Sequence, residues 1–309
     1  MAVMCRTPSL ITLFSFLAAA FAGCHNPSAS SPTASTGAAP AAAPVASVPA
    51  PSVPAPSFAV GTTVSGPALA PAATTPPVAA PVVAPVVAML ARGELPPVTI
   101  HLAGDSTVCI YDPATTVQEG WGMELGQFFN DKVTVDNQAV GGANVRSFKA
   151  SGNWTRIMAA LKPGDYVLMQ FGANDSGTAH GPVNPPEYIA ILGQMADEIR
   201  AKGGTPIYVT PSAFFQWSAN GKQDNSRLAA HTAACYTAGA ANNALVVDLN
   251  ARGVEWLNSI GQKTAADFYL PVRGAPDKAH FVKSGATQMA QLVAGEIGRI
   301  KSPLAAYLK

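Results

Sequence analysis

Residues 98–107 read VTIHLAGDST, and they predict the first strand of the fold. The first six residues mix apolar and β-branched side chains, and the run stops at Gly104, which small polar residues follow. This pattern is typical of a buried strand that leads into a tight turn. Ser106 stands just past the carboxyl end of that strand, which is where open α/β sheets bind their ligands.

Ser106 alone is weak evidence of a functional site, because most serines in strand-to-helix turns cap a helix or form the turn. A second polar motif, Asp277-Lys278-Ala279-His280, follows about 170 residues later. Two stretches that offer amide donors lie between them, at Gly141-Gly142 and at Asn174. These additional motifs make Ser106 a candidate nucleophile.

Strand and helix patterns alternate along the rest of the chain. We expect strands at 98–103, 132–137, 165–171, 205–211 and 245–249, and helices at 120–129, 184–203, 224–241 and 284–300. Such alternation predicts a mainly parallel sheet with helices on both faces. Five strands favour a doubly wound, three-layer α/β/α sandwich.

Charge separates the first part of the chain from the rest. Arg6, Arg92 and Glu94 are the charged side chains before Val98, which leaves 17 basic and 17 acidic residues from Val98 onward. This balance gives no support for binding nucleic acid. We expect one domain of roughly 210 residues at 98–309, which is long enough to bury a sizeable core.

The first 24 residues have the pattern of an export signal. Arg6 precedes an apolar run from Leu10 to Phe21, and small residues follow it up to Cys24. A run of about a dozen apolar residues is typical of a secretory signal and too short for an ordinary membrane span. The stretch 21–24 also resembles a lipoprotein processing site that would lipidate Cys24, although Phe21 departs from the usual Leu. Ordinary cleavage that releases a soluble protein is the alternative.

Residues 25–97 are rich in Ala, Pro, Val, Ser and Thr and contain 16 of the chain's 27 prolines. Proline at this density excludes helix and central strand, so we expect an extended, disordered tether. A spacer of this kind suits an enzyme that is held on a surface while it reaches a bulky substrate. A low-complexity linker without a selected length is the alternative.

The four cysteines do not indicate a metal site. Cys5, Cys24, Cys109 and Cys235 form no C-x-x-C pair, and none has a histidine at metal-ligand spacing. Cys109 and Cys235 are compatible with a disulfide bond in an oxidising compartment or with two separate buried thiols, and the second reading is favoured.

A serine hydrolase needs a base beside its nucleophile and a group that orients the base. His280 precedes the final helix in a predicted loop, and Asp277 three residues earlier can reach its Nδ1–H. This arrangement would leave Nε2 to face Ser106. His180 is a rival base in another loop, and a surface turn is the alternative interpretation of the D-x-x-H motif.

Two stretches offer donors for an oxyanion. Gly141-Gly142 follows the second predicted strand and permits a backbone amide to approach the site closely. Asn174 follows the third predicted strand and offers a side-chain amide. Turn-forming glycines and a helix-capping asparagine are the alternatives.

Taken in order, these motifs resemble the SGNH (GDSL-type) hydrolase superfamily and, within it, the rhamnogalacturonan acetylesterases. The matching stretches are 104–107 (GDST), 120–122 (GWG), 137–142 (NQAVGG), 146–148 (RSF), 163–175 (PGDYVLMQFGAND) and 277–286 (DKAHFVKSGA). They span essentially everything after the predicted tether.

The resemblance implies a triad of Ser106, Asp277 and His280. It implies an oxyanion hole made of the Ser106 and Gly142 backbone N–H groups and the Asn174 side chain. It also implies a flavodoxin-like sheet and a reaction without a cofactor or a metal.

The chain departs from the acetylesterase branch at two places. Ala173 stands where that branch usually has His, and residues 212–217 (SAFFQW) replace a stretch that tends to be basic. Both positions are expected near the substrate, so the departures affect the sugar recognised more than the chemistry. Asp175, Trp217 and Phe281 are the expected substrate contacts.

The sequence as a whole predicts a monomeric serine esterase that removes acetyl groups from a plant cell-wall polysaccharide, most simply pectic rhamnogalacturonan. We expect it in the periplasm, on the cell surface as a lipoprotein, or secreted, with a lipid on Cys24 as its one membrane contact. An esterase that acts on xylan acetate or acyl lipids is one alternative. A carbohydrate-binding lipoprotein without activity is another.

Overall fold

The computed structural model describes residues 93–309. The predicted signal 1–24 with Cys24, and most of the predicted tether 25–97, lie outside the described residues. Leu95 and Pro96 are half-buried parts of the folded unit, and the Tyr307 hydroxyl donates to the Pro96 carbonyl at 2.9 Å. The described helices include none that is both long and apolar enough to cross a bilayer.

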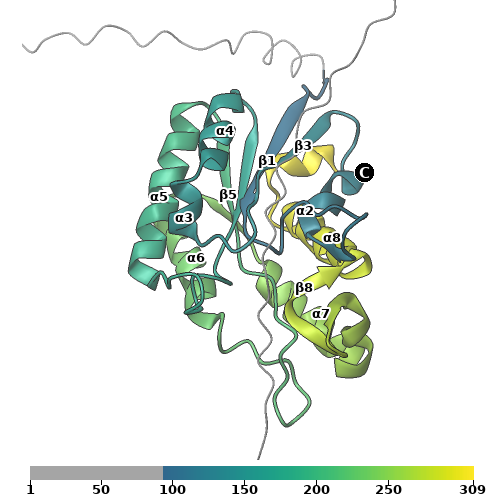
Figure 1. The fold of residues 1–309 in the computed structure, drawn as a ribbon. Helices are drawn as coiled ribbons and strands as arrows, with labels where there is room; N and C mark the ends of the chain where they lie inside the picture. Colours follow the sequence, from purple (N-terminus) through teal and green to yellow (C-terminus); the bar gives the residue numbers. More distant parts are fainter. Residues whose placement is uncertain (1–92) are drawn as a thin grey trace, which may run out of the picture. The chain divides into compact units, whose positions relative to one another are not determined.

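Five parallel strands form the central sheet (Figure 1). They are β1 (Val98–Gly104), β3 (Val133–Asn137), β4 (Tyr166–Gln170), β5 (Thr205–Val209) and β6 (Leu245–Val247). Their order is β3-β1-β4-β5-β6, which corresponds to the flavodoxin-like arrangement. The predicted three-layer sandwich is confirmed, and each of its strands lies within two residues of the predicted range.

Helices cover both faces of this sheet (Figure 1). One face carries α3 (Val145–Lys149), α4 (Gly152–Ala160), α5 (Pro185–Ala201) and α6 (Ala229–Ala241). The other carries α2 (Trp121–Glu124), α7 (Leu249–Ala265) and α8 (Lys283–Arg299), together with the 3-10 turns η1 (Leu125–Phe128), η2 (Ala266–Phe268) and η3 (Pro303–Tyr307).

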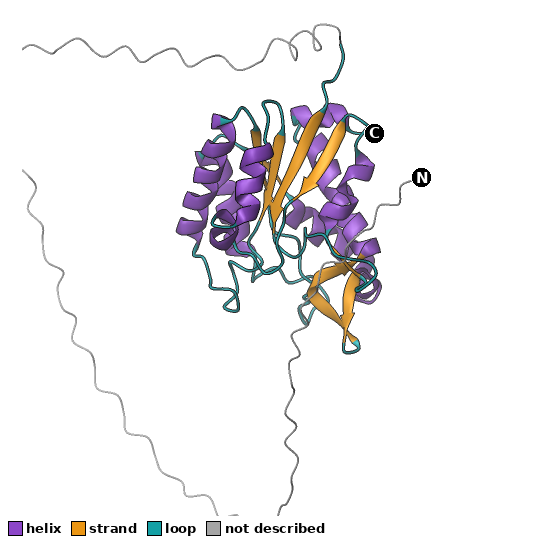
Figure 2. Ribbon diagram, turned by 45° about the horizontal axis from the view of Figure 1, so that its top comes forward, coloured by secondary structure: helices purple, strands orange, loops and turns teal. Residues whose placement is uncertain are grey.

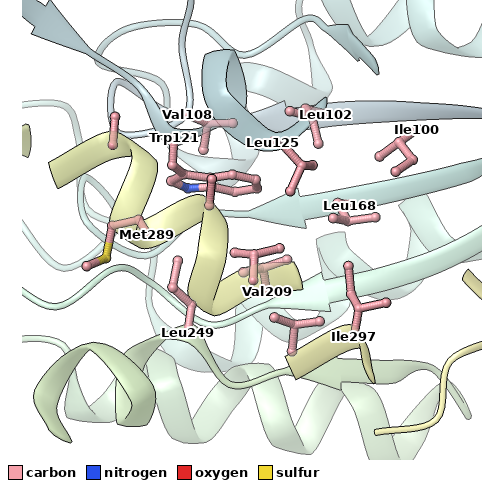
Figure 3. Packing of buried hydrophobic residues seen from close by; sticks show 14 of the residues in the cluster. Ile100, Leu102, Val108, Trp121, Leu125, Leu168, Val209, Leu249, Met289 and Ile297 are labelled. Carbon is pink, nitrogen blue, oxygen red and sulfur yellow. The ribbon is translucent and has the colours of Figure 1, made fainter. Parts of the chain in front are cut away.

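Alternate residues of each strand feed two separate cores. Ile100 and Leu102 belong to the core on the face of α2 and α8, in the same cluster as Trp121 (Figure 3). Val167 and Met169 of β4 belong to the core on the opposite face, beneath α5. Each such side chain is fully buried or nearly so, and burial of this kind stabilises the fold by about 1.5–3 kcal/mol per residue.

A second, three-stranded antiparallel sheet was not predicted (Figure 2). It consists of β2 (Gln118–Glu119), β8 (Ala275–Val282) and β7 (Tyr269–Val272), in the order β2-β8-β7. The predicted loop before the final helix is therefore wrong, because Asp277 and His280 lie on β8. A two-residue turn joins β7 to β8, and both of its residues, Arg273 and Gly274, have the positive φ that such tight hairpins require.

The helices differ from the sequence prediction in four further ways. The predicted helix 120–129 is divided into α2 and η1, and the helix predicted at 224–241 begins only at Ala229. The short helices α3 and α4 and the long α7 were not predicted. Leu249 was assigned to a strand, but the Asp248 side chain accepts the Ala251 N–H at 3.1 Å and starts α7 there.

Candidate active site

Ser106 lies in the turn directly after β1, at the carboxyl edge of the sheet. The Asp105 carboxylate builds this turn, because its Oδ1 accepts the Thr107 N–H at 2.9 Å and the Thr107 hydroxyl at 2.8 Å. Gly104, the residue before Asp105, has no room for a side chain, since an added Cβ would stand 2.6 Å from a methyl group of Val108. Ser106 itself is half-buried, while both of its neighbours in the chain are buried.

The side chains of Ser106, His280 and Asp277 form a continuous chain of hydrogen bonds. The Ser106 hydroxyl donates to His280 Nε2 at 2.9 Å, and His280 Nδ1–H donates to Asp277 Oδ1 at 2.9 Å. Asp277 Oδ1 also accepts the backbone N–H groups of Ala279 and His280 at 2.7 and 2.8 Å. The imidazole is thereby fixed with an unprotonated nitrogen facing the hydroxyl.

The electrostatics suit a base that gains a proton during a reaction. Burial would raise the pKa of Asp277, but the Ala279 and His280 N–H groups and the His280 ring lower that pKa below its usual value. Asp277 is therefore ionised at neutral pH and can stabilise an imidazolium. The His280 and Asp277 side chains are 30% and 28% exposed, so the pair remains open to a solvent-borne substrate.

The predicted oxyanion donors lie on loops at the same sheet edge. Gly142 has a left-handed φ of +77° in the loop after β3, a conformation that favours glycine. Asn174 follows β4, and its Nδ2 donates one hydrogen to the Ala143 carbonyl at 2.9 Å, which leaves the second for a ligand. Within 93–309, neither the Ser106 nor the Gly142 backbone N–H donates to a protein acceptor.

His180, the rival base, makes no hydrogen bond to Ser106 in the described part of the chain. Its ring lies against Gly142, where an added Cβ would stand 3.2 Å from His180 Cε1. The hydrogen bond to Ser106 comes from His280. His180 is therefore a neighbour of the oxyanion loop, and its own side chain is exposed.

Two of the three expected substrate contacts are wrong for geometric reasons. Asp175 is 1% exposed, and its carboxylate accepts the Val145 N–H at 3.0 Å and the Gly172 N–H at 2.8 Å. It joins the loops that carry Gly142 and Asn174, and so acts as a positioning residue. Phe281 is fully buried and packs on the Tyr269 ring.

Trp217 remains a candidate substrate contact. It is half-buried and packs edge-to-face against Phe215, with ring centroids 6.1 Å apart. The Trp217 Nε1–H has no partner among the described residues. Because this nitrogen is itself buried, only the exposed part of the Trp217 ring is open to contact with a sugar.

A family model described as the GDSL-like Lipase/Acylhydrolase family matches residues 102–282. The match includes the turn of Ser106, the loops that carry Gly142 and Asn174, and the Asp277–His280 pair. The chain belongs to this family. It is therefore a carboxylic ester hydrolase.

Individual relatives agree with this family assignment. "Probable rhamnogalacturonan acetylesterase YesY" of Bacillus subtilis (strain 168) is 32% identical over 213 residues, which are 66% of this chain and 94% of the relative. Rhamnogalacturonan acetylesterase RhgT of the same organism is 31% identical over 221 residues, or 69% and 94%. The crystal structure of B. subtilis YxiM has a TM-score of 0.61 at 29% identity, and the match covers 67% of this chain and 57% of that chain.

A buried polar network that the sequence did not predict lies beneath Ser106 of this GDSL-like hydrolase. Gln170, the last residue of β4, donates to the Thr107 hydroxyl at 2.7 Å and accepts the Trp121 indole N–H at 2.7 Å. The Ser212 hydroxyl also donates to Gln170, at 3.1 Å. A polar residue at the end of an otherwise apolar strand was the available signal.

The structure also answers the question of the two cysteines in this GDSL-like hydrolase. Cys109 and Cys235 are both buried and both free, so the two-thiol interpretation holds. Between residues 93 and 309, no group of three or more His, Cys, Asp or Glu side chains is arranged to bind a metal ion.

Proposed function

We propose that this GDSL-like hydrolase removes O-acetyl groups from a plant cell-wall polysaccharide, with Ser106 as the nucleophile. The observation that carries the proposal is the unbroken hydrogen-bond chain from Asp277 through His280 to Ser106. The names of the two B. subtilis relatives support acetyl esters of rhamnogalacturonan as the substrate.

In the proposed reaction the Ser106 oxygen attacks the acetyl carbonyl carbon while His280 Nε2 takes the hydroxyl proton. The carbonyl oxygen becomes an oxyanion, which the Ser106 and Gly142 N–H groups and Asn174 Nδ2 stabilise. His280 then gives its proton to the sugar oxygen as the ester C–O bond breaks. Water, deprotonated by His280, hydrolyses the acetyl-enzyme, and acetate leaves.

Replacing Ser106 tests this function directly. We expect Ser106→Ala to lower kcat for acetate release from acetylated rhamnogalacturonan by at least about 10⁴-fold, because the nucleophile is lost while the binding surface remains. The exposed Ser259→Ala variant is the matched control, since its hydroxyl only donates to the Trp256 carbonyl within α7. Wild-type turnover by Ser106→Ala would exclude the proposed nucleophile.

Two measurements separate the alternative functions. A chain-length series of p-nitrophenyl esters distinguishes the proposed acetylesterase, which should prefer acetate, from a lipase, which should prefer octanoate. Labelling by a fluorophosphonate that is lost in Ser106→Ala distinguishes an esterase from a binding protein without activity. Export and the lipid on Cys24 stay predictions from residues 1–24.

A further inference from the structure

Arg227 lies beside the proposed active site and has no part in the reaction described above. Its guanidinium donates to the Ala173 carbonyl at 3.3 Å and lies over the Phe214 ring, 5.1 Å from the centroid. It also covers Gly177, where an added Cβ would stand 2.5 Å from a guanidinium nitrogen. Arg227 therefore sits on the loop that carries Asn174.

A small apolar cluster connects Arg227 to both halves of the site. Ala173, Phe214 and Leu228 are buried together, and Ala279 of β8 packs against them. Ala173 directly precedes Asn174 in the chain, and Ala279 directly precedes His280. Arg227 thus contacts a cluster two of whose members directly precede Asn174 and His280 in the chain.

The charge of Arg227 is not neutralised within the described part of the chain. Four of the other six described arginines, at 146, 200, 252 and 299, lie within 4 Å of a carboxylate, whereas Arg227, like Arg156 and Arg273, has no such partner in the range 93–309. Asp224, the nearest acid along the chain, instead accepts the Gln216 side-chain amide at 2.7 Å and the Ser226 N–H at 2.9 Å. Most of the five guanidinium N–H donors of Arg227 remain available.

We propose that Arg227 binds a carboxylate of the substrate, which makes it the residue that selects an acetylated polymer containing uronic acid over a neutral one. The inference rests on the proposed function, because it needs an ester held at Ser106. Guanidinium groups bind carboxylates through two parallel hydrogen bonds. The Phe214 ring beneath Arg227 limits the orientations that the planar guanidinium can take.

The test compares one variant on three substrates. Arg227→Gln removes the charge and the guanidinium but keeps a polar, shorter side chain. On acetylated polygalacturonate we expect KM to rise about tenfold with kcat within twofold of wild type, because a charge-assisted contact to the bound polymer is lost. On the same polymer with its carboxylates methyl-esterified, and on p-nitrophenyl acetate, we expect kcat/KM to stay within twofold.

Two further variants sharpen the result. Arg227→Lys keeps the charge but not the two parallel N–H donors of the guanidinium, so we expect an intermediate KM on the acidic polymer. Arg156→Gln is the control, because Arg156 is also exposed and has no carboxylate partner in the described chain, but it lies on α4. Added salt should reduce the difference in KM on the acidic polymer between wild type and Arg227→Gln, because it screens the charge of the guanidinium.

The outcomes distinguish this inference from the proposed function. Equal KM values for wild type and Arg227→Gln on the acidic polymer would refute the carboxylate site, and so would an equal loss on the methyl-esterified polymer. Neither result would affect the nucleophile, which the hydrolysis of p-nitrophenyl acetate by wild type and Ser106→Ala tests separately.

Discussion

At the scale of single residues, Asp105 has the most unusual environment in the site. It directly precedes Ser106 and is fully buried, and its Oδ2 atom has no hydrogen-bond partner among the described residues. Burial raises the pKa of Asp105 from 3.8 to about 6, although the Thr107 N–H and hydroxyl oppose this change. The Asp105 carboxyl group is therefore kept next to Ser106 at a cost in stability.

The sign of the resulting pH dependence follows from proton binding. Between about pH 4 and pH 6 the folded state binds more protons at Asp105 than the unfolded state, so this residue makes the protein less stable as the pH rises. A shift of two pKa units corresponds to about 3 kcal/mol. Relative to wild type, the free energy of unfolding of Asp105→Asn should therefore increase by up to that amount between pH 4 and pH 8, as measured by urea unfolding.

A control fixes the interpretation of the Asp105 experiment. The exposed Asp131→Asn variant also removes one carboxylate, but from a surface position before β3. The prediction requires the gain in free energy of unfolding between pH 4 and pH 8 to be larger for Asp105→Asn than for this surface variant. Equal gains for the two variants would show that burial does not perturb Asp105.

At the scale of elements, a buried histidine links the strands on both sides of β1. His101 Nδ1 lies 2.8 Å from Asp136 Oδ2 on β3, and His101 Nε2 lies 3.6 Å from Asp165 Oδ2 at the start of β4. Asp165 also accepts the Thr99 N–H of β1 at 2.7 Å. His101 is only 2% exposed, and burial alone would lower its pKa, but the two carboxylates raise that pKa above 6.5.

Protonated His101 should therefore hold the three strands together in mildly acidic solution. Because the folded-state pKa is raised, its stabilisation is fully present below about pH 6.5 and is lost as the pH rises through the folded-state value. We expect His101→Gln to be less stable than wild type at pH 6 and closer to wild type at pH 9. Thermal midpoints of both proteins at the two pH values test this, and a gap that widens with pH would contradict it.

The strands also explain why the sequence predicted some elements and not others. Strands β1 and β4 were predicted because each is a run of apolar residues that ends at a turn signal. Strand β8 was missed because Pro276, Asp277 and Lys278 interrupt its apolar pattern, and because its partners β2 and β7 are distant or short. Its pairing depends on tertiary contacts that local patterns do not contain.

The candidate site shows the same division. The sequence predicted the group of Ser106, His280 and Asp277 because these residue types and their spacing satisfy a chemical requirement. That requirement holds whether residues 277–280 form a loop, as predicted, or part of β8. The burial of Asp175 and Phe281 could not be predicted, because the direction of a side chain at a loop or strand end depends on what packs against it. Arg227 was missed because its contacts come from loops that follow two different strands.

At the scale of the whole molecule, the two cores and the proposed site all lie within residues 93–309. Leu95 packs on the core beneath α8, and the Pro96 carbonyl accepts the Tyr307 hydroxyl at 2.9 Å. These contacts are at the amino ends of the strands, whereas Ser106 is at the carboxyl edge. Leu95 and Pro96 thus contribute to stability at the edge of the sheet opposite Ser106.

Two shortened chains test this separation of stability from activity. A chain that begins at Gly93 keeps both contacts, so we expect its kcat/KM for p-nitrophenyl acetate to equal that of the full chain. A chain that begins at Val98 loses the Leu95 packing and the hydrogen bond of Tyr307, which should lower its free energy of unfolding by about 1–3 kcal/mol relative to the Gly93 chain. Its kcat/KM should nevertheless equal that of the Gly93 chain, because the lost contacts and Ser106 lie at opposite ends of β1. Urea unfolding and initial rates give the two quantities, and equal stability of the two shortened chains or a loss of activity in the shorter one would refute the argument.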